Sequence, residues 1–183
     1  MKITTITAVL FASIVICGAE NLMKQKTTTY KVSPGSWYKG ILKSKQLGKL
    51  IDRDLDMTSG KRKGMLSDGK TFQQAVAYNY HNIPKEKRFL TVDIDLGKAV
   101  DLDTINVIVM ENNNMHKPSH VEVSFSQDNM VFRNPATCKE WIKKQYDRKA
   151  VLKGDWKQSR FVRIKIYAAS TWLNLTEVEI FAK

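Results

Sequence analysis

The chain has 183 residues, of which 43% are hydrophobic, and a formal net charge of +12 at pH 7. This length and apolar content favour one globular domain with its own core. The lysines and arginines are scattered and no basic recognition helix is visible, which argues against a nucleic-acid-binding protein. The acidic partners that remain are sulfated or uronic glycans and anionic lipid surfaces. An equal alternative is that the basic surface contacts only solvent and binds no acidic partner.

The N-terminus has the pattern of a secretory signal peptide. Lys2 gives a basic start, residues 6–17 form an apolar run, and Gly18-Ala19 supplies small residues before the polar chain. The run is too short to span a bilayer comfortably. We therefore expect residues 1–19 to be a signal peptide, residues 20–29 a polar entry segment and residues 30–183 one exported domain, secreted, periplasmic or at the cell surface. A lipoprotein anchored at Cys17 is the alternative, although Ile16 is bulkier than the residue usual before a lipidated cysteine.

The cysteine count excludes an intrachain disulfide in the mature protein. The chain has two cysteines, and cleavage after Ala19 would remove Cys17 and leave Cys138 alone. An exported domain without disulfides depends on its hydrophobic core for stability.

The pattern of residues predicts an all-β fold. Residues 30–69 read as irregular, with a short helical turn within residues 48–57. From Phe89 onward, apolar and polar residues alternate with the period of a half-buried strand. The segments with this period are Leu90–Leu96, Ile105–Val109, Val121–Phe125, Val162–Ile166 and Val178–Ile180. We expect Gly97-Lys98 to be a turn that ends the first strand, and only residues 139–148 have helical spacing. The whole predicts an antiparallel β-sandwich.

Three fragments, in order, resemble a known family. They are Leu66-Ser67-Asp68-Gly69, the strand Val92–Gly97 with its Asp-Leu-Gly end, and the strand and turn Pro118–Asp128. The chain from Tyr30 to Lys183 resembles the discoidin, or coagulation factor V/VIII C-type, domain, a galactose-binding-like jelly roll. It is most similar to the accessory modules of bacterial glycoside hydrolases. Asn129 stands where the family's turn has glycine, and asparagine tolerates the left-handed conformation that such a turn needs.

The resemblance implies a non-catalytic carbohydrate-binding or adhesion module whose ligand is held by loops at one end of the sandwich. The corresponding loops here are residues 72–88, 111–117 and 168–174. Aromatic rings stack on sugar faces, while amides, histidine and arginine hydrogen-bond sugar hydroxyls. The candidate ligand-binding residues are Tyr80, His81, Arg88, Asn112, Asn114, His116 and Trp172. Trp172 also fits a framework tryptophan packed on the core, and asparagine-rich loops are common turn chemistry.

The resemblance further implies a structural calcium ion but no required cofactor. Asp68, Thr71 and Glu177 match the family's calcium ligands by position, and hard oxygen ligands suit calcium. The Asp68–Thr71 loop is more compressed than usual, and Lys70 places a cation within it.

Two other classes of function stay open, and an enzyme is not expected. The histidines and Cys138 form no nucleophile–base pattern, and Pro118 prevents a helix that would align His116 with His120. A peripheral binder of anionic membrane lipid is permitted by the charge, although only Met115 and Trp172 offer apolar loop tips. A structural or assembly protein without a small ligand is also compatible, and the oligomeric state is open.

Overall fold

The structure is a computed structural model that describes residues 20–34, 65–67, 76–80, 83–111 and 116–183. The predicted signal peptide and the predicted helical turn within residues 48–57 lie outside these residues. The strands are β1 Thr29–Pro34, β2 Val76–Asn79, β3 Phe89–Met110, β4 Pro118–Ser126, β5 Arg133–Cys138, β6 Ile142–Lys144, β7 Asp147–Ala168 and β8 Trp172–Ala182. The short 3-10 turns are η1 Leu22–Lys24, η3 Met65–Ser67 and η4 Lys85–Lys87. The predicted all-β class is confirmed. Among the described residues, no helix is long and apolar enough to cross a membrane.

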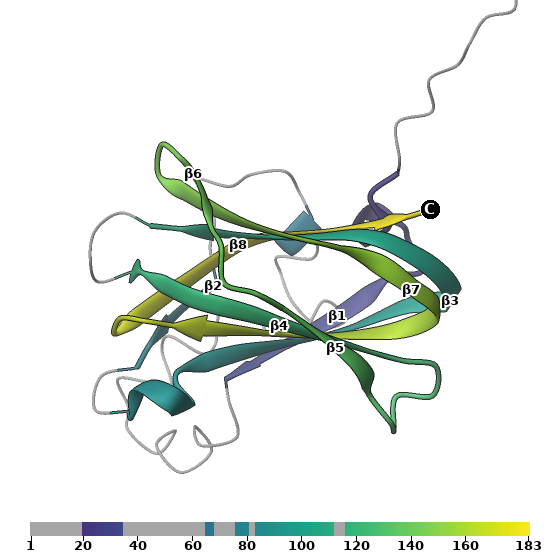
Figure 1. The fold of residues 1–183 in the computed structure, drawn as a ribbon, viewed down its shortest axis with the longest axis horizontal. Helices are drawn as coiled ribbons and strands as arrows, with labels where there is room; N and C mark the ends of the chain where they lie inside the picture. Colours follow the sequence, from purple (N-terminus) through teal and green to yellow (C-terminus); the bar gives the residue numbers. More distant parts are fainter. Residues whose placement is uncertain (1–19, 35–64, 68–75, 81–82, 112–115) are drawn as a thin grey trace, which may run out of the picture.

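Two strands of 22 residues, β3 and β7, build both layers of the sandwich (Figure 1). The first part of β3, residues 89–95, pairs with residues 161–167 of β7, and the second part, residues 104–110, pairs with residues 147–153. One layer therefore has the order β1-β3-β7-β4-β5, and the other has the order β2-β8-β3-β7-β6. All these pairs are antiparallel. The sandwich is one sheet folded over at the bends of β3 and β7.

The bend of β3 lies at Gly97, where the sequence predicts the end of a strand. The register between β3 and β7 shifts between Asp95 and Val100. Gly97 has a φ of 79°, and its N–H donates to Oδ1 of Asp95 at 2.8 Å. The expectation that Gly97-Lys98 ends the strand is wrong, because the chain turns the corner while it stays paired with β7. The two segments predicted as separate strands around it are two parts of β3.

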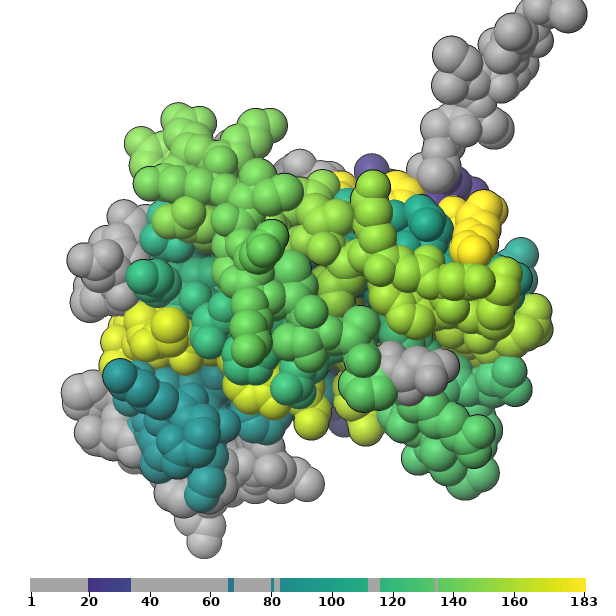
Figure 2. Space-filling view, viewed as in Figure 1, coloured from purple at the N-terminus to yellow at the C-terminus, as the bar shows by residue number. Residues whose placement is uncertain are grey.

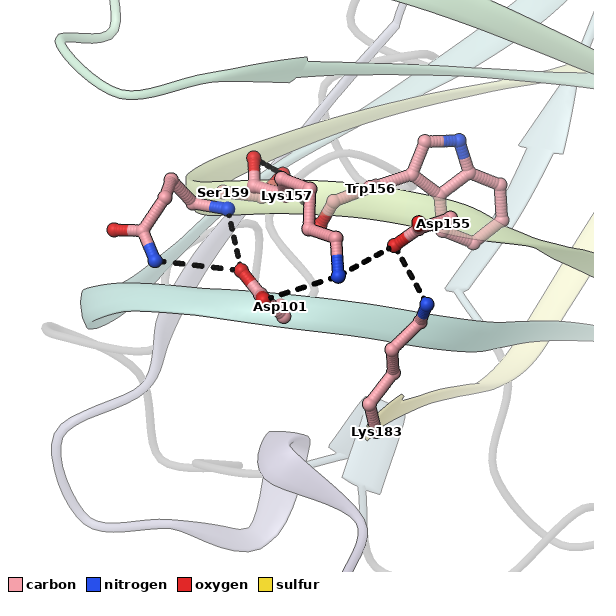
Figure 3. A network of polar contacts seen from close by, with 7 residues as sticks. Asp101, Asp155, Trp156, Lys157, Ser159 and Lys183 are labelled. Carbon is pink, nitrogen blue, oxygen red and sulfur yellow. Dashed lines mark hydrogen bonds and ion pairs between the residues drawn. The ribbon is translucent and has the colours of Figure 1, made fainter.

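The bend of β7 is held by a polar network (Figure 3). The Lys157 ammonium lies between two carboxylates, 3.4 Å from Asp101 and 3.1 Å from Asp155. Lys183 reaches Asp155 at 2.7 Å. Gln158, with a φ of 49°, donates its backbone N–H to Asp101 at 2.8 Å. These donors lower the pKa of Asp101, chiefly through Gln158, and the two lysines lower the pKa of Asp155. The network fixes the corner from its solvent side.

The core lies between the two layers and follows the predicted alternation. Val92 and Ile94 of β3 are buried, and they pair with Ile164 and Val162 of β7, which are buried as well. Burying one such aliphatic side chain stabilises the fold by roughly 1.5–3 kcal/mol. Cys138 is a free, half-buried thiol, so the described domain depends on this core.

Two segments differ from the sequence-based expectation near the N-terminus. Leu22 and Met23, in the expected polar entry segment, are buried in the core. The Asn21 side chain accepts hydrogen bonds from the N–H groups of Met23 and Ile180, which ties η1 to β8. Residues 29–34, expected to be irregular after Thr29, form strand β1 beside β3. The sandwich therefore includes the entry segment.

The predicted helical spacing of residues 139–148 is wrong. These residues form β6, a turn and the start of β7, and Ile142 pairs with Lys149 across the hairpin. Gln145 adopts a φ of 50° at the turn. A short isolated helix is only marginally stable because its first turn is costly to form, whereas the hairpin extends the ladder of β7.

Candidate functional site

Three connections meet at one end of the sandwich, which we call the loop end (left in Figure 1). They are the β2–β3, β3–β4 and β7–β8 connections. The Tyr80 N–H donates to the Thr171 carbonyl at 2.6 Å, and the Ala169 N–H donates to the Lys117 carbonyl at 2.9 Å. The Ala168 N–H donates to the Arg88 carbonyl at 2.8 Å. The β7–β8 connection thus binds both of the others, as the sequence-based proposal of clustered loops requires.

Ser170 is the residue that joins these connections most closely, and the sequence gives no signal for it. Its hydroxyl accepts from the Lys117 N–H at 2.7 Å. The same hydroxyl lies 3.2 Å from the Lys117 carbonyl and 3.1 Å from the Trp172 carbonyl, to which it can donate. It therefore fixes the end of the β3–β4 connection against the first residue of β8.

Trp172 and His116 are neighbours at the loop end. Their ring centroids lie 6.1 Å apart and the rings are tilted by 40°. Both residues are half-buried. Burial lowers the pKa of His116, which favours the neutral imidazole at pH 7. A neutral imidazole has one nitrogen that donates and one that accepts a hydrogen bond.

Arg88 contributes a positioned guanidinium. Its Nε donates to the Ile83 carbonyl at 2.6 Å, and its Nη1 donates to the Ser170 carbonyl at 3.3 Å. A guanidinium has five N–H groups, so about three remain without a protein acceptor among the described residues. The half-buried side chain is therefore held in place, and its other N–H groups have no acceptor within the described ranges.

Tyr80 does not take the place expected for it. Its side chain is 0% exposed and packs in the core, so its ring offers no face to a ligand. The loop assigned to residues 72–88 contains strand β2, and the loop assigned to residues 168–174 is shorter, because β7 ends at Ala168 and β8 starts at Trp172. His81, Asn112 and Asn114 lie outside the described residues, and their roles stay predictions.

The loop end gathers side chains of several chemical kinds. A half-buried indole, an imidazole, a guanidinium and the exposed Lys117 lie along connections that are bonded to one another. Such groups give an apolar face, neutral hydrogen-bonding atoms and positive charge. No group of three or more His, Cys, Asp or Glu side chains that could hold a metal ion occurs within the described ranges.

The predicted calcium ligands are only partly within the described residues. Asp68 and Thr71 lie outside them, and Glu177 is 2% exposed. The turn η3 packs against β8, so the strand with Glu177 runs beside the residues that precede Asp68. A buried carboxylate needs a cation or hydrogen-bond donors. The calcium site stays a prediction.

Comparisons with known proteins identify the fold. No protein-family model matches the sequence, and neither does any curated protein. Among solved structures, CpGH89CBM32-5 from Clostridium perfringens, in complex with GalNAc-β-1,3-galactose, has a TM-score of 0.56 and 13% identity over 85% of this chain and 96% of that one. The lectin binding domain of lectinolysin, complexed with Lewis b, has a TM-score of 0.58 and 14% identity over 91% and 98%. A Streptococcus pneumoniae fucose binding module has a TM-score of 0.53 and 14% identity over 91% and 98%. The chain has the galactose-binding-like, discoidin-type fold that its sequence predicts.

Proposed function

We propose that the protein is a non-catalytic carbohydrate-binding module that holds a glycan at the loop end. The observation that carries this proposal is the meeting of Trp172, His116 and Arg88 around Ser170. The similar structures support it, because their names state complexes with GalNAc-β-1,3-galactose and Lewis b and a module that binds fucose. Asn112, Asn114 and His81 belong to the same connections and remain part of the proposed contact set.

Each group at the loop end has a role that sugar chemistry requires. The apolar face of a pyranose ring packs on an indole, as other apolar surfaces do. The neutral imidazole of His116 exchanges hydrogen bonds with hydroxyls, and Arg88 donates to ring or hydroxyl oxygens. A hydrogen bond to a neutral hydroxyl contributes about 0.5–1.5 kcal/mol. A few such bonds and one stacked ring give weak binding, which repeated ligands on a surface strengthen.

A glycan is a better partner for the loop end than a membrane. Large hydrophobic residues that insert into lipid have to be exposed at the contacting tips. The exposed ones among the described residues are Met130 and Val131, after β4, and Ile142 and Tyr146, in the β6–β7 hairpin. None of these four belongs to the three connections of the loop end, although Ile142 and Tyr146 lie in the hairpin beside it. Met115 of the β3–β4 connection lies outside the described residues. Anionic lipid is therefore the second choice, and a purely structural role is the third.

The charge and the N-terminal pattern add two finer proposals. The module works in an exported compartment, because residues 1–19 have the pattern of a signal peptide. Its glycan carries acidic groups, because the chain has a net charge of +12 and Arg88 and Lys117 lie at the loop end. Affinity for such a glycan should fall as salt rises, since screening weakens exposed charge pairs.

The test is a glycan array with galactose-, N-acetylgalactosamine- and fucose-terminated ligands, followed by affinity measurement on the best one. We expect Trp172→Ala to weaken binding about tenfold, which is roughly 1.4 kcal/mol. Trp141→Ala is the matched control, because Trp141 donates to the Ser119 carbonyl at 2.9 Å and lies outside the three connections. Circular dichroism checks that both variants fold. A folded Trp172→Ala variant with undiminished affinity would move the site away from the loop end.

A further inference from the structure

A groove lies beside the β6–β7 hairpin, and we call it the hairpin groove. Its volume is about 460 Å³. It is lined by Ile108, Ile142, Lys144, Tyr146, Asp147 and Lys149, among others. In the ladder, Ile142 and Ile108 both pair with Lys149, and Lys144 pairs with Asp147, which places these residues on one face. That face is the outer one, because Val107 and Val109 on either side of Ile108 belong to the core.

The groove combines a buried floor with exposed apolar walls. Ile108 is 8% exposed, whereas Ile142 is 60% and Tyr146 is 46% exposed. Isolated exposed apolar residues need no explanation, but two of them in one concave site indicate a contact surface. A tyrosine ring beside an aliphatic side chain offers the apolar face on which a sugar ring packs.

The charges of the groove favour an anionic group. Its lining has two lysines and one aspartate, Asp147. Lys149 is paired with Glu179 at 3.1 Å, and Glu179 also accepts from the Asn106 amide at 2.8 Å. Lys144 is exposed and has no carboxylate partner in the part of the chain that the structure describes. An anion on the ligand can therefore reach Lys144 without breaking an existing ion pair.

The groove adjoins the loop end. The Glu111 N–H, at the start of the β3–β4 connection, donates to the Tyr146 carbonyl at 2.7 Å. The Glu111 carboxylate accepts two hydrogen bonds from Arg148, at 2.6 and 3.0 Å. Arg148, together with the charges of Lys117 and Lys143, lowers the pKa of Glu111. Lys117 lies at the loop end and Lys143 in the hairpin, so Glu111 is the point where both surfaces meet. Figure 1 shows the hairpin at the same end of the sandwich as these connections.

We propose that the hairpin groove is a second subsite, which binds a sugar unit carrying a carboxylate or sulfate group. The inference rests on the proposed function, since the unit belongs to the same glycan chain that the loop end holds. Tyr146 and Ile142 pack on the apolar face of this unit, Lys144 pairs with its anionic group, and Asp147 accepts from a hydroxyl. A glycan that reaches both subsites gains affinity over one that fills the loop end alone.

The test compares three immobilised polymers: an unsulfated galactan, a sulfated galactan and polygalacturonate. The variants are Lys144→Glu and, as a matched control, Lys98→Glu, which changes net charge equally at the exposed bend of β3. We expect Lys144→Glu to weaken binding to an acidic polymer about tenfold, to leave the neutral galactan within about twofold, and to exceed the effect of Lys98→Glu. The sulfated galactan and polygalacturonate tell sulfate from carboxylate. Tyr146→Ala should weaken binding to the long chains but not to a monosaccharide.

The outcomes separate the two proposals. One outcome is that wild type binds neutral and acidic polymers equally well and only Trp172→Ala loses affinity. This result would overturn the second subsite and leave the proposed function standing. If Lys144→Glu and Lys98→Glu lose affinity for acidic polymers equally, the effect comes from net charge alone, and the second subsite is again overturned. If wild type and Trp172→Ala bind acidic polymers equally well and Lys144→Glu does not, the groove is supported as a binding site and the loop end is refuted. Binding of phosphatidylserine vesicles without retention on any polymer would refute both.

Discussion

The turn after β4 shows how much a single residue can fix. The Asp128 carboxylate accepts from the N–H groups of Met130 at 2.8 Å and Val131 at 3.1 Å, and from the Ser126 hydroxyl at 2.9 Å. Asn129 has a φ of 63°, as its place in the turn predicts. The backbone donors, Met130 first, lower the pKa of Asp128 to about 2. The turn therefore depends on an ionised carboxylate.

This dependence predicts how acid affects stability. The pKa of Asp128 is lowered from 3.8 in the folded protein, so its contribution is present above pH 4 and is lost as the pH falls toward 2. Asp128→Asn keeps one acceptor oxygen but removes the charge. We expect the variant to be less stable than wild type at pH 7, and the gap to narrow between pH 4 and pH 2. Thermal unfolding across that range is the measurement, and a constant gap would contradict the assignment.

Among single residues, the sequence could predict His116, Trp172 and Arg88 as site residues but not the whole site. These three lie in connections that the resemblance placed at one end, and the structure brings them together. Tyr80 is in the same stretch, yet its burial depends on packing between distant strands, which local composition does not report. Ser170 acts through bonds to Lys117, 53 residues away in sequence, and a lone serine has no pattern.

Among the elements, strands with long alternation were predictable and short edge strands were not. All five predicted segments lie within strands, two of them in β3, because each has one face on the core and therefore a clear period of two. Strands β1, β2, β5 and β6 have three to six residues, and all four lie at sheet edges, where a segment is too short to show a long alternation. The continuity of β3 and β7 through their bends is set by tertiary pairing. A glycine marks a bend and the end of a strand equally well.

The bend of β3 can be tested by substitution of Gly97. Its φ of 79° lies where side chains other than glycine are strained, and a Cβ would come within 2.9 Å of the Thr27 Cβ. We expect Gly97→Val to lower the free energy of unfolding by about 1–3 kcal/mol. Gly97→Asn should cost less, because asparagine tolerates this region of φ. Urea unfolding of both variants is the measurement. Equal stability of Gly97→Val and wild type would show that the bend relaxes without strain.

In the whole molecule, the two long strands β3 and β7 couple the stability of one end of the sandwich to that of the other. Each layer contains half of β3 and half of β7, so neither layer has a complete set of strands without them. Trp156 lies at the corner end, stacked on Phe125 with centroids 4.6 Å apart, and Trp172 lies at the loop end. Figure 2 shows green, teal and yellow segments, which are far apart in the sequence, side by side on the face in view. Loss of one end should therefore remove partners of the other.

We accordingly predict one cooperative unfolding transition that both ends report. Two single-tryptophan variants keep either Trp156 or Trp172 and replace the other three tryptophans with phenylalanine. Fluorescence of each should give the same urea midpoint as the circular dichroism of that same variant, since a two-state domain loses all its structure together. The common midpoint can differ between the variants, because the substitutions themselves change stability. A Trp172 signal that changes at lower urea than the circular dichroism of its own variant would mean that the loop end opens first, while the corner held by Lys157 and its two carboxylates persists.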